Sequence, residues 1–329
     1  MSSIPLSSDT IAIMKSVQKY LYQFGCPILM FIGTISCIIN LIVFTQKILR
    51  KNPCSIYFIA YNVANFIYIY SSLLALTLSV GYSIDASVYN LIICRLRLYT
   101  VTLFNILSPF YIILASIDRI LITSSNALTR QRSTRRLAYL CIIIGTLFWA
   151  LFHIHALIAS SITQLAPNTF LCYFQPGVHL IFVSYYALIK ETSSLSLMII
   201  CGLWSIKNIR SMGRVRMIVN TSVSKTTTGG SIQSNSSKDQ QLMFMLLMDI
   251  IIYASFSFVF VIYLMYQQTT QNYIKNAERI QIETCIRNIC LFSAGIPFCT
   301  SCYANLIVSK TFRSEAKKAI SWKRILCIN

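Results

Sequence analysis

The sequence predicts an all-α membrane protein, a seven-transmembrane helix bundle followed by a short amphipathic helix after the seventh span. The first observation is composition: the 329 residues are 56% hydrophobic and only 11% charged, whereas a soluble domain carries about 25% charged residues. The second is the mean hydropathy of +0.65. The third is pattern, because the apolar residues form long runs that are separated by short polar and basic stretches.

Each of the seven apolar runs is long enough to cross roughly 30 Å of hydrocarbon as a helix of about 20 residues. The fifth run starts with two charges, Lys190 and Glu191. The alternating pattern of a membrane barrel is absent, and helices satisfy their own backbone in lipid. The predicted spans are approximately residues 27–46, 56–80, 92–123, 137–159, 187–207, 240–266 and 285–309.

The distribution of basic residues predicts the orientation. With the N-terminus outside, 20 of the 28 Lys and Arg residues fall on the cytoplasmic side, as the positive-inside rule requires. The expected protein is therefore multi-pass, with its C-terminus in the cytoplasm. The plasma membrane is its expected location. The net charge of +19 is explained by attraction to the anionic inner leaflet, so membrane lipids are expected partners and nucleic acid is not.

Three segments are expected: an extracellular N-terminus at 1–26, a membrane domain at 27–309, and a C-terminal segment at 310–329. Within the membrane domain, residues 217–238 are rich in Ser, Thr and Gly and are predicted to form a flexible cytoplasmic loop. Two interpretations of this loop stay open, a plain linker and a loop that is phosphorylated.

The C-terminal segment is predicted to contain an amphipathic helix on the inner leaflet. Its apolar residues share one face at helical spacing, with lysines opposite. Those residues are Phe312, Ala316, Ala319 and Ile320. Cys327 is a candidate for acylation, although an unmodified cysteine fits equally well.

Charged residues inside or at the end of a span are costly and usually functional. Asp118 and Arg119 lie at the inner end of the third span. A carboxylate beside a guanidinium can be paired in one state and released in another, although a plain salt bridge at a helix end is the alternative. Asp249, inside the sixth span, is a second candidate for a functional polar core, with Asn40 or Asn65 as expected partners.

Together these features resemble the rhodopsin-like G-protein-coupled receptors over nearly the whole chain. Cys94 precedes Asp118 by 24 residues, about 36 Å along a helix, which is the family's separation between its disulfide cysteine and its Asp-Arg-Tyr motif. The resemblance implies a disulfide between Cys94 and Cys172. Cys26 and Cys285 are candidates for a second disulfide, as in some peptide receptors.

Further positions match or depart from this family. Gly33 and Asn40 resemble the first-span pattern, and Trp149 stands where the family has a structural Trp in the fourth span. The third-span motif reads Asp-Arg-Ile, and Asn65 replaces the sodium-site Asp. The sixth span lacks the Cys-Trp-x-Pro signature, and Tyr303 comes two residues before the usual position of its motif. The pattern is most similar to a divergent, invertebrate type of neuropeptide receptor.

The resemblance implies an extracellular ligand and a heterotrimeric G protein as partners. Arg119 would leave Asp118 and face the G protein, and Asp239 is a candidate second partner for Arg119 in the resting state. Val101 stands where aminergic receptors have an Asp, so an amine is not the expected ligand. A peptide is the favoured ligand. Carboxylates near the outer face could attract a basic peptide or be solvated: Asp85, Glu191, Glu278 and Glu283. The expected pocket residues are Asn105, Phe256, Phe260 and Glu191.

Two other functions stay open, a seven-span receptor that does not couple and a membrane transporter. Transporters usually show internal repeats, and no repeat is evident in this sequence. An enzyme is not expected, because no nucleophile accompanies the three histidines. No metal site or cofactor is expected either, since His and Cys do not cluster at zinc spacing.

Overall fold

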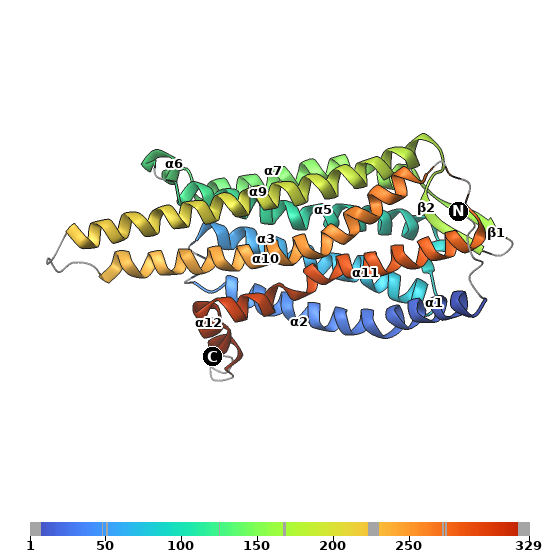
Figure 1. Ribbon diagram of the computed structural model, residues 1–329, viewed down its shortest axis with the longest axis horizontal. Coiled ribbons are helices and arrows are strands. Elements are labelled where there is room, and N and C mark those ends of the chain that lie inside the picture. The colour runs from blue at the N-terminus through green and yellow to red at the C-terminus, as the bar shows by residue number, and fades with distance from the viewer. Residues whose placement is uncertain are drawn as a thin grey trace.

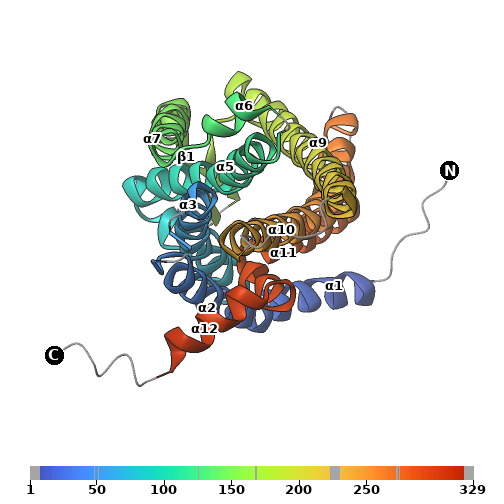
Figure 2. The same ribbon diagram turned by 90° about the vertical axis from the view of Figure 1, so that its left-hand side faces the viewer.

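The computed structural model describes residues 8–47, 49–50, 52–124, 126–166, 169–222, 230–271, 273 and 275–321. Within these ranges, seven helical spans are long and apolar enough to cross a membrane. They are Ile11–Phe44, Pro53–Gly81, Leu91–Ile122, Arg135–Ile158, Val178–Asn208, Gln240–Thr269 and Glu278–Val308. The spans run along the long axis of the molecule (Figure 1) and surround a common axis when viewed from one end (Figure 2). The predicted seven-helix bundle is confirmed.

The first half of the chain forms the first four spans. Its α-helices are α1 (Ser8–Tyr20), α2 (Cys26–Phe44), α3 (Pro53–Tyr68), α4 (Leu74–Leu76), α5 (Leu91–Ile122), α6 (Ala127–Gln131), α7 (Arg135–Phe152) and α8 (Ile154–Ile158). Three π-helical turns lie at Leu21–Gly25, Ile69–Leu73 and Thr77–Gly81, and a 3₁₀ turn lies at Ala86–Val88. Polar side chains fix where the long helices begin. Asn52, Asn90 and Thr134 each accept a hydrogen bond from the first turn of α3, α5 and α7, as N-cap residues do.

The second half contains a hairpin and three long helices. Its elements are β1 (Ser160–Ala166), β2 (Thr169–Phe174), α9 (Val178–Ser222), α10 (Gly230–Thr269), α11 (Ala277–Val308) and α12 (Lys310–Ile320). The hairpin is antiparallel, with Ile162 opposite Cys172. Following the predicted orientation, we call the end of the bundle with β1 and β2 the outer end, and the end with α6 and α12 the inner end (Figure 1).

Several helices run further than the sequence predicted. The first span begins at Ile11, inside the stretch that was predicted to be an extracellular segment. α9 reaches Ser222 and α10 starts at Gly230, so both enter the predicted loop 217–238, of which 223–229 lie outside the described residues. Adding one residue to a formed helix costs far less than starting a helix, and this explains why polar residues continue these helices.

The outward surface of the bundle is apolar, as lipid requires. α7 stands at the edge of the bundle (Figure 2) and exposes a row of large apolar side chains. They are Leu140, Ile144, Leu147 and Leu151, each 53–67% exposed. Soluble proteins rarely expose a continuous apolar patch of this kind, so the surface of α7 fits contact with hydrocarbon.

The predicted amphipathic helix is confirmed as α12, which turns away from the long axis of the bundle (Figure 1). Phe312 and Ala316 are buried, and the Phe312 ring lies 5.7 Å from the ring of Phe44 on α2. Ser309 caps the helix by accepting a hydrogen bond from Phe312 N. The side chains of Ala319 and Ile320, and the acylation candidate Cys327, lie outside what the structure describes.

Gly33 allows α2 and α11 to approach closely. A Cβ atom at position 33 would lie 2.7 Å from Cys299 Sγ and 2.8 Å from Ile69 Cδ1, closer than such atoms can come. At Gly202 on α9, the nearest atoms to an added Cβ are at 3.7 Å. The first position therefore needs glycine, and the second does not.

We predict that Gly33→Ala lowers the unfolding temperature of the purified protein, because overpacking costs about 1–3 kcal/mol. The matched control Gly202→Ala should keep or raise this temperature, since Ala is favoured over Gly in a helix by up to about 1 kcal/mol. Gly33→Ala combined with Cys299→Ala should recover part of the loss. Equal unfolding temperatures for Gly33→Ala and Gly202→Ala would contradict the close approach of α2 and α11.

Candidate functional site

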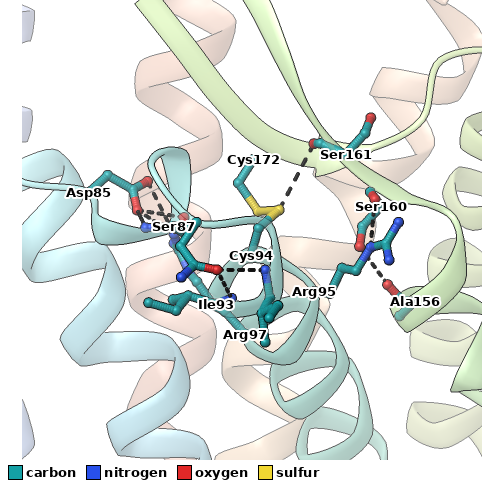
Figure 3. The surroundings of a disulfide bond; sticks show 12 residues. Asp85, Ser87, Ile93, Cys94, Arg95, Arg97, Ala156, Ser160, Ser161 and Cys172 are labelled. Atoms are coloured by element: carbon teal, nitrogen blue, oxygen red, sulfur yellow. Dashed lines mark hydrogen bonds and ion pairs between the residues drawn. A yellow bond between two sulfur atoms is a disulfide. The ribbon is translucent and has the colours of Figure 1, made fainter.

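A disulfide fastens the outer end of α5 to the hairpin. Cys94 lies in the first turn of α5, and Cys172 lies in β2. The two cysteines form a disulfide with their Cα atoms 5.6 Å apart (Figure 3), which confirms the predicted bridge. Since the hairpin follows the fourth span and precedes the fifth, the bridge holds this connection over the end of α5.

Two arginines beside Cys94 strengthen the same anchor (Figure 3). Arg97 Nη1 lies 3.2 Å from both carboxylate oxygens of Asp85, and Arg95 Nε donates to Ser160 O at 3.4 Å. Asp85 also caps the 3₁₀ turn by accepting a hydrogen bond from Ser87 N. The outer end of α5 is therefore tied both to the connection before it and to the hairpin.

The candidate second disulfide between Cys26 and Cys285 is absent, because both residues are buried free thiols. Cys285 Sγ lies 3.9 Å from Met14 O, and Met14 precedes Cys26 by 12 residues on a nearly continuous helix. Twelve residues extend about 18 Å, whereas a disulfide needs Cα atoms within about 7 Å. The prediction was wrong because the first helix starts well before Cys26.

A buried ion pair lies inside the bundle on α9. Lys190 Nζ is 2.5 Å from Glu191 Oε1 and donates to Asn105 Oδ1 on α5 at 2.6 Å. Tyr253 on α10 donates to Glu191 Oε2 at 3.4 Å. Glu191 is only 4% exposed. We call Asn105, Lys190, Glu191 and Tyr253 the interior cluster; it connects three helices by charge-assisted hydrogen bonds.

The interior cluster contains two of the four predicted pocket residues. Asn105 and Glu191 both bind Lys190, while Phe256 and Phe260 lie half-buried, further along α10 towards its outer end. Sequence reasoning missed Lys190 and Tyr253. Lys190 was treated only as a charge at the start of the fifth span. A charge inside an apolar run is the signal that could have identified it.

A polar core lies nearer the inner end, between α2, α3, α5 and α11. Asn40 Nδ2 donates to Asn62 Oδ1 at 2.8 Å and to Ser301 Oγ at 3.3 Å. Ser108 donates to Asn65 Oδ1 at 2.5 Å. The predicted polar roles of Asn40 and Asn65 therefore have partners on other helices, which such side chains need in a membrane.

Asp249 is buried near this core but has different surroundings from those predicted. Its Oδ2 has no hydrogen-bond partner among the described residues. Its expected partners bond elsewhere: Asn40 Nδ2 donates to side chains on α3 and α11, and Asn65 Oδ1 accepts from Ser108 on α5. Asp249 is therefore a buried acid, 3% exposed, with one carboxylate oxygen that has no hydrogen-bond partner among the described residues.

The Asp118–Arg119 pair is buried at the inner end of α5. Arg119 Nη2 lies 2.9 Å from Asp118 Oδ2, and the side chains are 1% and 6% exposed. The same Nη2 donates to Asn52 Oδ1 at 2.5 Å. On the other side, Ser133 Oγ donates to Asp118 Oδ1. A buried charge pair is tolerated only when further hydrogen bonds satisfy both partners, and Asn52 and Ser133 supply these bonds.

The other predicted switch residues do not join this pair. Tyr303 donates to Ile32 O on α2 at 3.2 Å, so its hydroxyl is engaged with the first span. The side chain of Asp239 lies outside what the structure describes. Trp149 packs in an aromatic cluster, with its ring 6.3 Å from that of Phe110 on α5, which fits the predicted structural role.

Asn52 and Ser133 were missed from the sequence. Asn52 precedes Pro53 and has the pattern of a helix cap, and it does cap α3. Its second bond, to Arg119, depends on the packing of α3 against α5. Ser133 is 15 residues from Asp118, in a basic stretch that the positive-inside rule already explains, so no local pattern pointed to the contact.

No protein-family model matches the chain, and no curated protein matches it in sequence. Among the described residues, no group of three or more His, Cys, Asp or Glu side chains could hold a metal ion.

We predict that Lys190→Met destabilises the protein by about 3–5 kcal/mol, because it leaves Glu191 as an unpaired buried charge. The double variant Lys190→Met/Glu191→Gln should be clearly more stable than the single variant, since no charge then remains. Thermal unfolding of the purified variants measures both. A double variant that is no more stable than Lys190→Met would contradict the pairing.

Proposed function

We propose that this chain is a rhodopsin-like G-protein-coupled receptor of the plasma membrane, with its N-terminus outside. The observation that carries the proposal is the buried Asp118–Arg119 pair at the inner end of α5, on the same helix whose outer end is fixed by the Cys94–Cys172 disulfide. The seven spans, the amphipathic α12 and the polar core around Asn40 support it.

In this proposal Arg119 has two environments. In the first it is held by Asp118 and Asn52, as observed. In the second the inner end of α10 moves away from α5, and Arg119 contacts the C-terminal helix of the G-protein α-subunit. Hydrogen bonds to charged groups are worth about 1.5–3 kcal/mol each, which is enough to bias such an equilibrium by tenfold or more.

The ligand acts from the outer side through the interior cluster. Asn105, Glu191 and Tyr253 lie on α5, α9 and α10, the helices whose relative position must change. A ligand can shift the equilibrium only by binding the two arrangements with unequal affinity. Contacts of the ligand with Lys190 or Glu191 would do so, because they compete with the bonds that connect these helices.

We propose a peptide as the ligand, as the sequence suggested, without a requirement that it be basic. Asp85 is paired with Arg97, and Glu283 lies 2.5 Å from Lys275 and 3.1 Å from Arg279. Glu191 is paired with Lys190. Since internal cations already neutralise three of the four outer carboxylates, a net attraction to a basic ligand is not needed to select the peptide.

The test measures G-protein activation in cells that express the chain at the surface, screened with a panel of amidated neuropeptides. We expect a response in the wild type that falls at least tenfold in Arg119→Ala at matched surface level. A response that is unchanged in Arg119→Ala would contradict the role of the pair. Uptake of a solute without any G-protein response would favour a transporter instead, and peptide binding without a response would favour a non-coupling receptor.

We also predict that Asp118→Asn raises ligand-independent activation several-fold, because the neutral amide holds Arg119 less strongly than a carboxylate. The matched control is Asp85→Asn, which breaks an ion pair at the outer end and should leave basal activation unchanged. Basal signalling in the absence of ligand measures both variants. An equal change in the two variants would indicate a general loss of stability and would contradict a specific effect of Asp118.

A further inference from the structure

Ser133, in the turn between α6 and α7, contacts the Asp118–Arg119 pair. Ser133 Oγ donates a hydrogen bond to Asp118 Oδ1, while the other carboxylate oxygen of Asp118 holds Arg119. Ser133 is partly exposed, so this residue lies at the surface as well as beside the ion pair. A chemical change at this hydroxyl would therefore reach Asp118 directly.

Four exposed arginines flank Ser133 within three residues on either side. They are Arg130, Arg132, Arg135 and Arg136. The positive-inside rule explains basic residues in this loop, but it does not explain a serine at their centre that is bonded to a buried carboxylate. A hydroxyl between arginines is the chemistry that arginine-directed protein kinases bind, because their acidic substrate grooves pair with guanidinium groups.

We propose that Ser133 is a phosphorylation site through which a protein kinase separates the α6–α7 turn from Asp118. In the reaction, Ser133 Oγ forms a bond to the γ-phosphorus of ATP, and the bond from that phosphorus to the bridging oxygen breaks. ADP leaves, and the hydroxyl proton passes to the catalytic carboxylate of the kinase. The proposal rests on the proposed function in one respect, the cytoplasmic position of the α6–α7 turn.

Phosphorylation would turn the attraction between Ser133 and Asp118 into electrostatic repulsion. The hydroxyl loses the hydrogen that it now donates, and the phosphate adds a charge of about −1.5 to −2. A phosphate and a carboxylate at hydrogen-bond distance repel each other, so Ser133 must leave Asp118. The phosphate has favourable surroundings nearby, because Arg135 and Arg136 lie in the first turn of α7, at the end of the helix where its dipole favours an anion.

Thr134 provides a matched control for the modification. It neighbours Ser133 and lies among the same arginines, but its hydroxyl oxygen accepts a hydrogen bond from Leu137 N as the cap of α7. Thr134→Val removes that hydroxyl without changing the charges around Ser133. The variant Ser133→Ala removes the hydroxyl that would accept the phosphate. The double variant Arg130→Gln/Arg135→Gln removes two of the guanidinium groups that the kinase would bind.

The first test incubates the full chain, purified in lipid nanodiscs, with the catalytic fragment of a protein kinase C and Mg·ATP, and locates phosphate by mass spectrometry. We expect phosphate on Ser133 in the wild type and in Thr134→Val, none at position 133 in Ser133→Ala, and at least tenfold slower modification of Ser133 in Arg130→Gln/Arg135→Gln. A synthetic peptide of residues 126–140 serves as the control substrate. An unmodified Ser133 in the chain, when the peptide is phosphorylated, would overturn the proposal.

The second test compares amide hydrogen exchange of residues 126–134 in the phosphorylated and unmodified chain. We expect exchange in this segment to become several-fold faster after phosphorylation, because the turn loses its contact with Asp118. Unchanged exchange would overturn the separation of the turn from Asp118. Neither test uses a G protein, so a chain that is phosphorylated at Ser133 but never activates a G protein would contradict the proposed function alone.

Discussion

The structure depends most on the requirement that a charge removed from water be paired and hydrogen-bonded. Arg119 is among the largest fully buried side chains in the described part of the chain, and its position requires Asp118 beside it and Asn52 across from it. Asn52 also caps α3, and Asp118 also binds the α6–α7 turn. One pair of charges thereby fixes the positions of three segments at the inner end of the bundle.

α5 connects the buried ion pair at the inner end of the bundle with the disulfide at the outer end. Its first turn is held by the Cys94–Cys172 disulfide, its middle contacts the interior cluster through Asn105, and its last turns contain the Asp118–Arg119 pair. A change in how α9 packs against Asn105 therefore acts on a helix that is fixed at both ends. In the proposed receptor, these contacts would form the physical route from an outer ligand to Arg119.

The sequence predicted the features that depend on local pattern. Hydropathy located all seven spans, and helical spacing located α12 with Phe312 on its buried face. The sequence did not predict the contacts that depend on tertiary packing. The pairing of Cys26 with Cys285 was wrong because a longer first helix places Met14, not Cys26, beside Cys285. The contacts of Asn52 and Ser133 with the ion pair were missed, since a cap residue and a loop serine carry no signal of a partner 67 or 15 residues away.

We propose that Asp118, through Arg119, biases the position of the inner end of α10. A trifluoromethyl-phenylalanine probe at Phe244, which is 43% exposed on α10, reports this position by fluorine NMR of the full chain in nanodiscs. The account predicts that Asp118→Asn increases the population of a second probe signal, whereas Asp85→Asn leaves the spectrum of the parent chain unchanged. Identical spectra for the parent chain and Asp118→Asn would contradict it.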